Sequence, residues 1–196
     1  MKRLLPISIF LIVVVTNICP AQTSTEFYND MFKWRITIPA GFTNMSPAEY
    51  AANQKKGVAA IEKTYDGKVE NHSKPIFVFK SDQMHYLESN YQSFNTKIDG
   101  DYLKSCRNVN DMIFNTFKTQ MKGVQIDSTY SFQIINNLKF NVFKIVVTFP
   151  NSMMLNFYMF NRLFINKDFS VVMMYADKEK GEAMLNAFKK STFSRR

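Results

Sequence analysis

The chain has 196 residues, 46% of them hydrophobic and 15% aromatic, and a formal net charge of +9. This composition argues against an intrinsically disordered chain, and the length suits one domain with a sizeable core. The basic residues are dispersed along the chain and follow no nucleic-acid-binding motif. We therefore interpret the charge as a solvated surface and expect no nucleic-acid partner.

The first 21 residues have the pattern of an export signal. Lys2 and Arg3 precede an apolar run over residues 4–15, and Ala21 ends a short segment with small residues where a signal peptidase cuts. The apolar run falls short of the roughly 20 residues that a membrane-spanning helix needs. We predict cleavage between Ala21 and Gln22, no transmembrane segment afterwards, and a periplasmic or secreted protein with a single domain over residues 22–196.

The cysteines support a core-stabilised fold. Cleavage would remove Cys19 and leave Cys106 alone, so the mature chain could form no intramolecular disulfide. A lipoprotein is not expected, because the bulky Ile18 stands where a lipoprotein signal has a small residue. Cys106 lies at an apolar position of a helical pattern, and we interpret it as a small buried hydrophobe and not as a reactive thiol.

The first half of the mature chain predicts four strands and a helix. Strands are expected at residues 26–29 and 33–38, the second with strict polar–apolar alternation. Ser46-Pro47-Ala48-Glu49 is a capping box with proline at the first helical position, so a helix should run from Pro47 to about Lys63. A strand at 76–80, a polar connection at 82–89 and a weaker strand at 91–98 follow.

The second half predicts a long helix, a β-meander and a final helix. The helix covers residues 101–122, with apolar residues at helical spacing. Strands are expected at 124–135, 138–149, 153–165 and 169–175, and Asn136-Asn137 suits a tight hairpin turn. The third of these strands is apolar on both faces and must be covered on both faces. A helix over 177–190 ends the domain.

This order of elements, β-β-α-β-β-α-β-β-β-β-α, predicts an α+β fold. An antiparallel β-sheet flanked by helices on both faces, an α/β/α sandwich, is the natural packing of these parts.

Three segments resemble the PsbP-like superfamily, which includes PsbP, nuclear-transport Mog proteins and exported DcrB-type proteins. They are the strand and turn at 34–42 (Trp-Arg-Ile-Thr-Ile-Pro-Ala-Gly-Phe), the core strand at 75–79 (Pro-Ile-Phe-Val-Phe), and the closing strand, helix and Ser-x-Phe pattern at 166–193. The resemblance implies the sandwich fold and a binding or assembly module in place of an enzyme. It carries over no functional residues.

One group of residues suggests metal chemistry. Asp82, His85 and Glu88 are spaced three apart and would share a face if they formed a helical turn, so they are candidate metal ligands of a hydrolase. The other interpretation is a solvated loop with ordinary charges. The chain has no Gly-x-Ser-x-Gly, no His-Glu-x-x-His and no phosphate-binding glycine loop, so we assign no catalytic residues and expect no cofactor.

The strand at 153–165 suggests an apolar ligand site. Met153, Leu155, Phe157 and Met159 share one of its faces and could line a pocket between sheet and helix, or could simply fill the core. The leading hypothesis is an exported, non-catalytic module that binds another envelope protein or component, and it predicts an exposed apolar patch. The alternative is a carrier of a small apolar or lipid ligand, which predicts an enclosed cavity of several hundred Å³.

Overall fold

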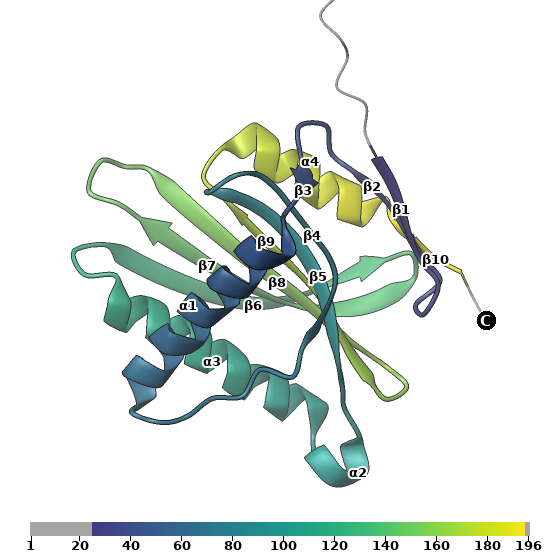
Figure 1. Cartoon of the computed structure of the whole chain (residues 1–196), viewed down its shortest axis with the longest axis horizontal. Coiled ribbons are helices and arrows are strands. Elements are labelled where there is room, and N and C mark those ends of the chain that lie inside the picture. Colours follow the sequence, from purple (N-terminus) through teal and green to yellow (C-terminus); the bar gives the residue numbers. More distant parts are fainter. Residues whose placement is uncertain (1–24, 195–196) are drawn as a thin grey trace, which may run out of the picture.

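The computed structural model describes residues 25–194, and within them it contains two sheets and four helices (Figure 1). The predicted export signal lies outside the described residues. The helices are α1 (Pro47–Tyr65), α2 (Thr96–Asp99), α3 (Tyr102–Gln120) and α4 (Lys178–Lys189). The strands are β1 (Thr25–Asn29), β2 (Trp34–Ile38), β3 (Thr43–Asn44), β4 (Lys74–Asp82), β5 (His85–Ser93), β6 (Gln125–Ile135), β7 (Leu138–Thr148), β8 (Met154–Phe164), β9 (Lys167–Tyr175) and β10 (Thr192–Phe193).

The large sheet has seven strands in the order β3-β4-β5-β9-β8-β7-β6, and each neighbouring pair is antiparallel. Helices α1 and α3 cover one face, which we call the α3 face (Figure 1). Helix α4 and a small sheet of β1, β2 and β10 cover the other, the α4 face. The predicted α+β sandwich with an antiparallel sheet between helices is therefore confirmed.

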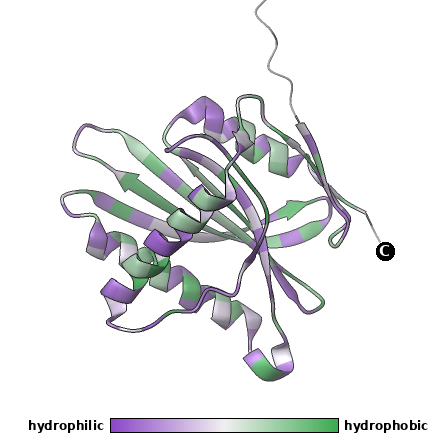
Figure 2. Cartoon of the chain, viewed as in Figure 1, coloured by the Kyte–Doolittle hydropathy of each residue, from purple (hydrophilic) through white to green (hydrophobic). Residues whose placement is uncertain are grey.

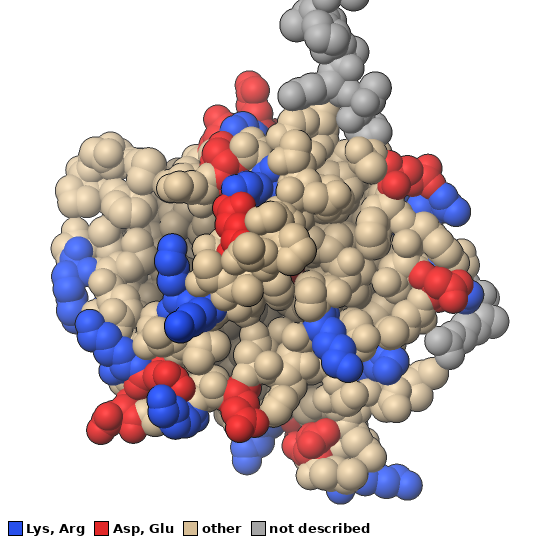
Figure 3. All heavy atoms as spheres, in the orientation of Figure 1, with Lys and Arg blue, Asp and Glu red and all other residues tan. Residues whose placement is uncertain are grey.

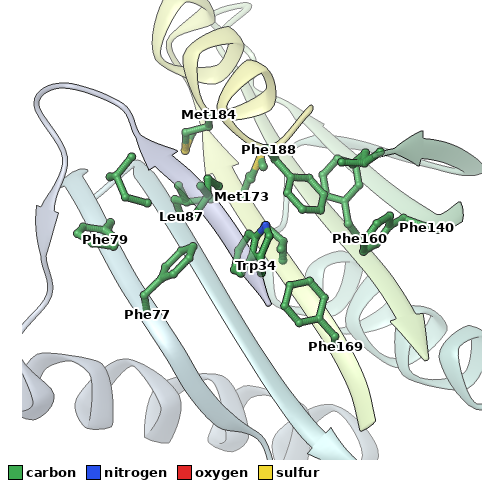
Figure 4. Packing of buried hydrophobic residues seen from close by; sticks show 14 of the residues in the cluster. Trp34, Phe77, Phe79, Leu87, Phe140, Phe160, Phe169, Met173, Met184 and Phe188 are labelled. Atoms are coloured by element: carbon green, nitrogen blue, oxygen red, sulfur yellow. The ribbon is translucent and has the colours of Figure 1, made fainter. Parts of the chain in front are cut away.

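The main core lies on the α4 face and is built around Trp34. The indole is fully buried and stacks between Phe77 and Phe193, with ring centroids 5.4 and 5.7 Å away. Figure 4 shows it among aromatic side chains from β4, β9 and α4, including Phe169 and Phe188. Aromatic rings bury large apolar areas, so this cluster joins the small sheet, α4 and the large sheet into one unit.

A second apolar cluster lies under α3. Phe143, Ile145, Val147 and Leu155 form its buried centre, and residues of α3 pack on it. The β8 residues on the opposite face, such as Phe160, belong to the main core. Strand β8 is therefore covered on both faces, as its sequence predicts. The alternation of hydrophobic and hydrophilic residues along the strands is visible in Figure 2.

The local signals at α1 and at the β6–β7 turn are also confirmed, with one difference. The Ser46 hydroxyl accepts the Glu49 backbone N–H at 3.2 Å and caps α1. The Glu49 carboxylate does not close the box, because it pairs with Lys80 on β4. Asn136 and Asn137 have φ values of +49° and +62°, the left-handed pair that a type I′ hairpin turn requires.

The prediction for residues 82–98 is correct only for the strand at residues 91–93. The expected polar connection at 82–89 is strand β5, which begins at His85, and the end of the expected strand at 91–98 is the short helix α2. Strand β5 lies inside the sheet between β4 and β9, yet the side chains that it turns to the α3 face are Tyr86, Glu88, Asn90 and Gln92. Such a strand lacks the apolar pattern on which strand prediction depends.

The two-residue strands β3 and β10 were also not predicted. Each is held by pairing to a distant segment, β3 to β4 and β10 to β2. Neither is long enough to show a period of two residues, so no local pattern could indicate them.

Candidate functional site

The three candidate metal ligands do not form one group. Asp82 ends β4 and His85 begins β5, and the His85 Nδ1 lies 2.6 Å from the Asp82 Oδ1. The His85 Nε2 accepts the Asp177 backbone N–H at 2.9 Å, and Asp82 accepts from the Lys180 ammonium at 2.8 Å. Both residues therefore connect the β4–β5 turn to the start of α4.

Glu88 lies on the opposite face of the sheet from His85. Side chains alternate between the two faces along a strand, so residues three apart point to opposite faces. The Glu88 carboxylate accepts hydrogen bonds from Tyr50 on α1 at 3.1 Å, from Asn90 at 2.8 Å and from the hydroxyl of Tyr86. The helical turn that would have aligned it with Asp82 and His85 does not exist. Among residues 25–194 no three His, Cys, Asp or Glu side chains are placed to hold a metal ion.

The four candidate ligand-lining residues belong to the core under α3 or to its edge. Leu155 is buried, and Phe157 and Met159 pack beside it, with Phe157 contacting Phe117 of α3 at a centroid distance of 5.8 Å. Met153 precedes β8 and is 37% exposed. None of the four lines the cavity between α3 and the sheet or the cavity beside the β8–β9 turn.

The first of these cavities lies between α3 and the sheet and has a volume of about 120 Å³. We call it the α3–β6 cleft. Helix α3 contributes one wall and strands β6, β7 and β8 contribute the floor. Its lining residues are Leu103, Cys106, Arg107, Asn110, Tyr130, Ser131, Asn141, Val142, Phe143 and Asn161.

The cleft has an exposed, partly apolar mouth and a polar interior. Leu103 on α3 and Tyr130 on β6 are 51% and 50% exposed, whereas Asn110 and Asn161 are only 5% and 7% exposed. The Oδ1 of Asn110 is buried without a hydrogen-bond partner among the described residues. Buried polar atoms in proteins are nearly always paired, so this oxygen requires an explanation.

A partly buried carboxylate lies next to Asn161, one of the residues that line the cleft. Asp168 on β9 accepts from the Tyr102 hydroxyl at 2.7 Å and from Gln92 at 3.2 Å, and it hydrogen-bonds to Asn161. Burial raises the pKa of Asp168 above its ordinary value, although these three bonds act against the shift. The bond to Asp168 also orients the amide of Asn161, which lines the cleft.

Cys106 lines the same cleft and is only partly buried, which corrects its assignment to the core. Burial, the largest influence, raises the pKa of its thiol to about 11. The thiolate is the nucleophilic form of cysteine, so this environment does not favour a reactive side chain.

Strand β6, at the edge of the large sheet, carries a row of exposed apolar side chains beside the cleft. Tyr130, Phe132 and Ile134 are 50%, 62% and 64% exposed, and we call them the β6 stripe. The Tyr130 hydroxyl donates to Asp111 on α3 at 2.6 Å, and the Lys139 ammonium lies 4.4 Å from the centre of the Phe132 ring. Large adjacent apolar side chains on a surface are typical of interaction sites.

The sequence carries two signals for this site. The β6 stripe alternates with Ser131 and Gln133, but alternation alone does not reveal that the strand is at an edge. Asn110 occupies an inward position of the apolar pattern of α3, between Cys106 and Ile113. A polar residue at such a position is the signal that could have located the cleft.

The remaining surface has mixed charge. Figure 3 shows Lys and Arg side chains scattered among Asp and Glu over the visible face. Among the described residues, no helix is both long and apolar enough to cross a membrane.

Comparison with known structures identifies the fold. The solution structure of cyanobacterial PsbP (CyanoP) from Synechocystis sp. PCC 6803 is similar, with a TM-score of 0.56 and 6% sequence identity over 91% of this chain and 97% of that one. The Ran-binding protein Mog1p of Saccharomyces cerevisiae gives a TM-score of 0.42 at 8% identity, over 88% and 96% of the two chains. No family model and no curated protein sequence matches the chain. The similarity to CyanoP shows that this chain has a PsbP-like fold.

Proposed function

We propose that this chain is an exported, non-catalytic module that binds another protein of the cell envelope through strand β6. The observation that carries the proposal is the combination of an unpaired sheet edge with three adjacent exposed apolar side chains. The leading hypothesis from the sequence requires an exposed apolar patch of this kind.

The backbone of β6 is suited to pairing with an added strand. The strand has 11 residues in uninterrupted register with β7, and no described strand pairs with its outer edge. Natural edge strands are usually protected from pairing by proline, lysine, a bulge or short length. Strand β6 contains no proline or lysine, and Asp127 is its single charged residue. An extended segment of a partner can therefore continue the sheet by β-augmentation.

The side chains beside this edge indicate the chemistry of the partner. Alternate residues of an added strand would meet the β6 stripe, so the partner segment should carry apolar residues at every second position. Lys139 lies over Phe132, and Arg107 is exposed at the mouth of the cleft. We expect acidic residues in the partner segment to face these two cations.

The non-catalytic part of the proposal is supported by the roles of the titratable side chains. His85 has both ring nitrogens occupied by Asp82 and the Asp177 backbone, and Glu88 accepts three hydrogen bonds. These contacts hold elements of the fold together, so neither side chain is placed to act on a substrate.

The carrier of an apolar or lipid ligand has weaker support. Phe157 and Met159, which should line its pocket, contact other core residues. The larger of the two cavities, about 390 Å³, lies beside the β8–β9 turn, and its lining includes Arg162 and Lys167 as well as apolar residues. Its size is within the range of ligand pockets, but none of the four residues on which the carrier hypothesis rests, Met153, Leu155, Phe157 and Met159, lines it.

Photo-cross-linking in cells that produce the protein tests the proposed surface. A photoreactive phenylalanine analogue is placed at Phe132 or Ile134 and, as controls of 46% exposure, at Tyr28 and Tyr65. We expect a discrete protein adduct from the two β6 positions that is absent from the controls. The adduct from position 134 should disappear in a Phe132→Lys background and persist in a Tyr65→Lys background.

Two results would contradict the proposal. One is an absence of adducts from both β6 positions, and the other is the same adducts from β6 and from the controls. Melting temperatures of the two lysine variants establish that they are folded, which is expected because both side chains are exposed.

A further inference from the structure

The larger cavity, of about 390 Å³, has the size of a small-molecule site, and we call it the β8–β9 pocket. The turn between β1 and β2, the β8–β9 hairpin and the C-terminal strand β10 all contribute residues to its lining. Pockets for small molecules begin at roughly 300 Å³, so the volume leaves room for a ligand larger than a few waters.

The floor of the β8–β9 pocket is aromatic. Phe32, Phe164 and Phe193 line it, and the centroid of the Phe164 ring lies 5.4 Å from that of Phe32 and 5.6 Å from that of Phe193. Leu138 adds an aliphatic wall. A hydrocarbon chain that lies on this floor would remove apolar surface from water, which favours binding.

Two cations, Arg162 and Lys167, line the same pocket. The Arg162 guanidinium carbon lies 5.2 Å from the centre of the Phe164 ring, and its Nη1 donates to the Lys139 carbonyl oxygen at 2.7 Å. The Lys167 ammonium lies 5.5 Å from the centre of the Tyr91 ring. Contacts of this kind stabilise a cation without neutralising its charge, so both cations remain able to attract an anion.

No acidic side chain lines the pocket to balance these cations. Among residues 25–194 neither Arg162 nor Lys167 forms an ion pair. A third cation of the lining, Lys33, pairs with Asp30 at 2.5 Å, so its charge is already balanced. Asp168 follows Lys167 on β9, so its side chain points to the opposite face of the sheet. The pocket therefore combines apolar surface with an excess of positive charge, which favours an anionic ligand.

The rim of the pocket includes an exposed and strained isoleucine. Ile165 begins the β8–β9 turn, is 83% exposed and has a φ of +56°, a left-handed conformation that β-branched residues rarely adopt. Backbone strain of this kind is found preferentially at functional sites, including ligand clamps. A chain bound in the pocket would contact the Ile165 side chain and shield it from water.

The volume of the pocket limits the length of the ligand. It is about thirteen times the roughly 30 Å³ that a water molecule occupies in the liquid, which corresponds to a ligand of about ten to thirteen heavy atoms. We propose that the β8–β9 pocket binds an anionic amphiphile with a single aliphatic chain of about eight to ten carbons. Its head group lies beside Arg162 and Lys167, and its chain lies on the aromatic floor.

Titration of the ¹⁵N-labelled mature protein with octanoate tests the site by NMR. We expect saturable shifts at the backbone amides of Lys33, Leu138, Ile165 and Lys167, with a dissociation constant on the order of millimolar for about ten heavy atoms. Shorter acids should bind more weakly, by up to about fourfold for each methylene removed, because each buried methylene contributes to binding.

The head group is tested with ligands that have the same chain. Octan-1-ol is neutral and octylammonium is a cation, and each should bind at least about fivefold more weakly than octanoate. Octyl phosphate distinguishes two sources of the ligand. Tighter binding of octanoate would indicate free fatty acids, and tighter binding of octyl phosphate would indicate single-chain phosphate esters.

Variants of the two cations locate the head group. Arg162→Gln and Lys167→Gln should each weaken octanoate binding at least about fivefold and leave octan-1-ol binding unchanged, because the alcohol has no charge. Lys144→Gln is the matched control, since the Lys144 ammonium also lies over an aromatic ring, that of Tyr158 at 5.2 Å, but does not line the pocket. If Arg162→Gln fails to fold, Lys167→Gln decides.

A variant of the rim tests the contact with the chain. Ile165→Gly should weaken octanoate and octan-1-ol equally, because it removes apolar surface and no charge. It should not lower the melting temperature, since glycine adopts a positive φ without steric cost.

The inference is overturned if octanoate causes no saturable shift, which would mean that the pocket holds only solvent. It is also overturned if octanoate and octan-1-ol bind equally well, or if Lys167→Gln remains folded and binds octanoate as the parent does.

The pocket can be tested independently of the proposed protein-binding surface. Phe132→Lys should abolish cross-linking from β6 without changing octanoate binding, because Phe132 does not line the pocket. Absence of β6 adducts with retention of octanoate binding would reject the β6 surface and keep the pocket. Adducts from β6 without octanoate binding would do the reverse.

Discussion

The indole N–H of Trp34 donates to the Ser191 hydroxyl at 2.9 Å, across 157 residues of sequence. The same hydroxyl donates to the Phe188 carbonyl oxygen at 2.7 Å, at the end of α4. This bond gives the single tryptophan a partner for its polar atom inside an otherwise aromatic core, and it connects β2 to the C-terminal part of the domain.

Ser191→Ala should lower the free energy of unfolding by about 1–3 kcal/mol, because it leaves the buried indole N–H without an acceptor. The measurement is chemical denaturation, with Ser194→Ala as the control, since Ser194 is exposed. In a Trp34→Phe background the same serine substitution should cost less, because no indole N–H remains to be paired. Equal costs in the two backgrounds would show that the bond contributes nothing.

Asp82 should make the stability depend on pH. The Lys180 ammonium holds the pKa of the Asp82 carboxyl well below its ordinary value, and His85 and the Met84 backbone N–H act in the same direction against burial. A lowered folded-state pKa stabilises the protein above the unfolded pKa of about 3.9, and this contribution is lost as the pH falls through the folded-state pKa. Asp82→Asn should therefore lower the melting temperature at pH 7 and make progressively less difference below pH about 4.

Thermal melts of Asp82→Asn and the parent at pH 7, 4 and 2.5 check this prediction. Added salt should reduce the difference at pH 7, since the Asp82 side chain is 42% exposed. A difference between the two proteins that stays the same from pH 7 to pH 2.5 would mean that the charge of Asp82 is not involved.

Two helical glycines should respond in opposite directions to alanine. A Cβ at Gly181 in α4 would lie 2.3 Å from the Tyr175 ring, so Gly181→Ala should destabilise by about 1–3 kcal/mol. A Cβ at Gly57 in α1 would have no atom within 4 Å, so Gly57→Ala should stabilise α1 by about 0.5–1 kcal/mol through helix propensity.

Denaturation curves measure the Gly181 effect, and amide hydrogen exchange measures the Gly57 effect, because α1 has no fully buried residue and can open locally. If Gly181→Ala leaves the free energy of unfolding unchanged, then α4 lies farther from β9 than in this structure.

Export should produce a chain that begins at Gln22. Removal of the basic Lys2 and Arg3 lowers the formal net charge from +9 to +7. Intact-mass measurement of the protein from the envelope or the medium of producing cells checks the cleavage. Ala21→Leu should slow processing, because the peptidase requires a small residue there. A mass that still includes residues 1–21 would reject a cleaved signal.

Elements with strong local signals were predicted well. The N-cap at Ser46, the left-handed pair Asn136-Asn137 and the strand β8, which is apolar on both faces, each depend on neighbouring residues alone, so periodicity and turn chemistry were sufficient. The first six residues of strand β5 were missed because its polar side chains are stabilised by partners far along the chain. Glu88, for example, accepts from Tyr50, 38 residues away.

The spacing of Asp82, His85 and Glu88 shows the same limit for a site. Residues spaced three apart share a face on a helix but point to opposite faces of a strand. This segment forms a strand because it pairs with β4 and β9.

The sequence by itself determined which segments are amphipathic, where α1 begins and that the domain is an α+β sandwich, because these properties follow from short-range periodicity and backbone preference. Only the tertiary structure decided that β6 is an edge strand and that Asn110, Asn141 and Asn161 line one cleft. The order of strands in a sheet and the packing of a helix on that sheet depend on contacts between distant segments. Local residue patterns do not indicate which distant segments come into contact.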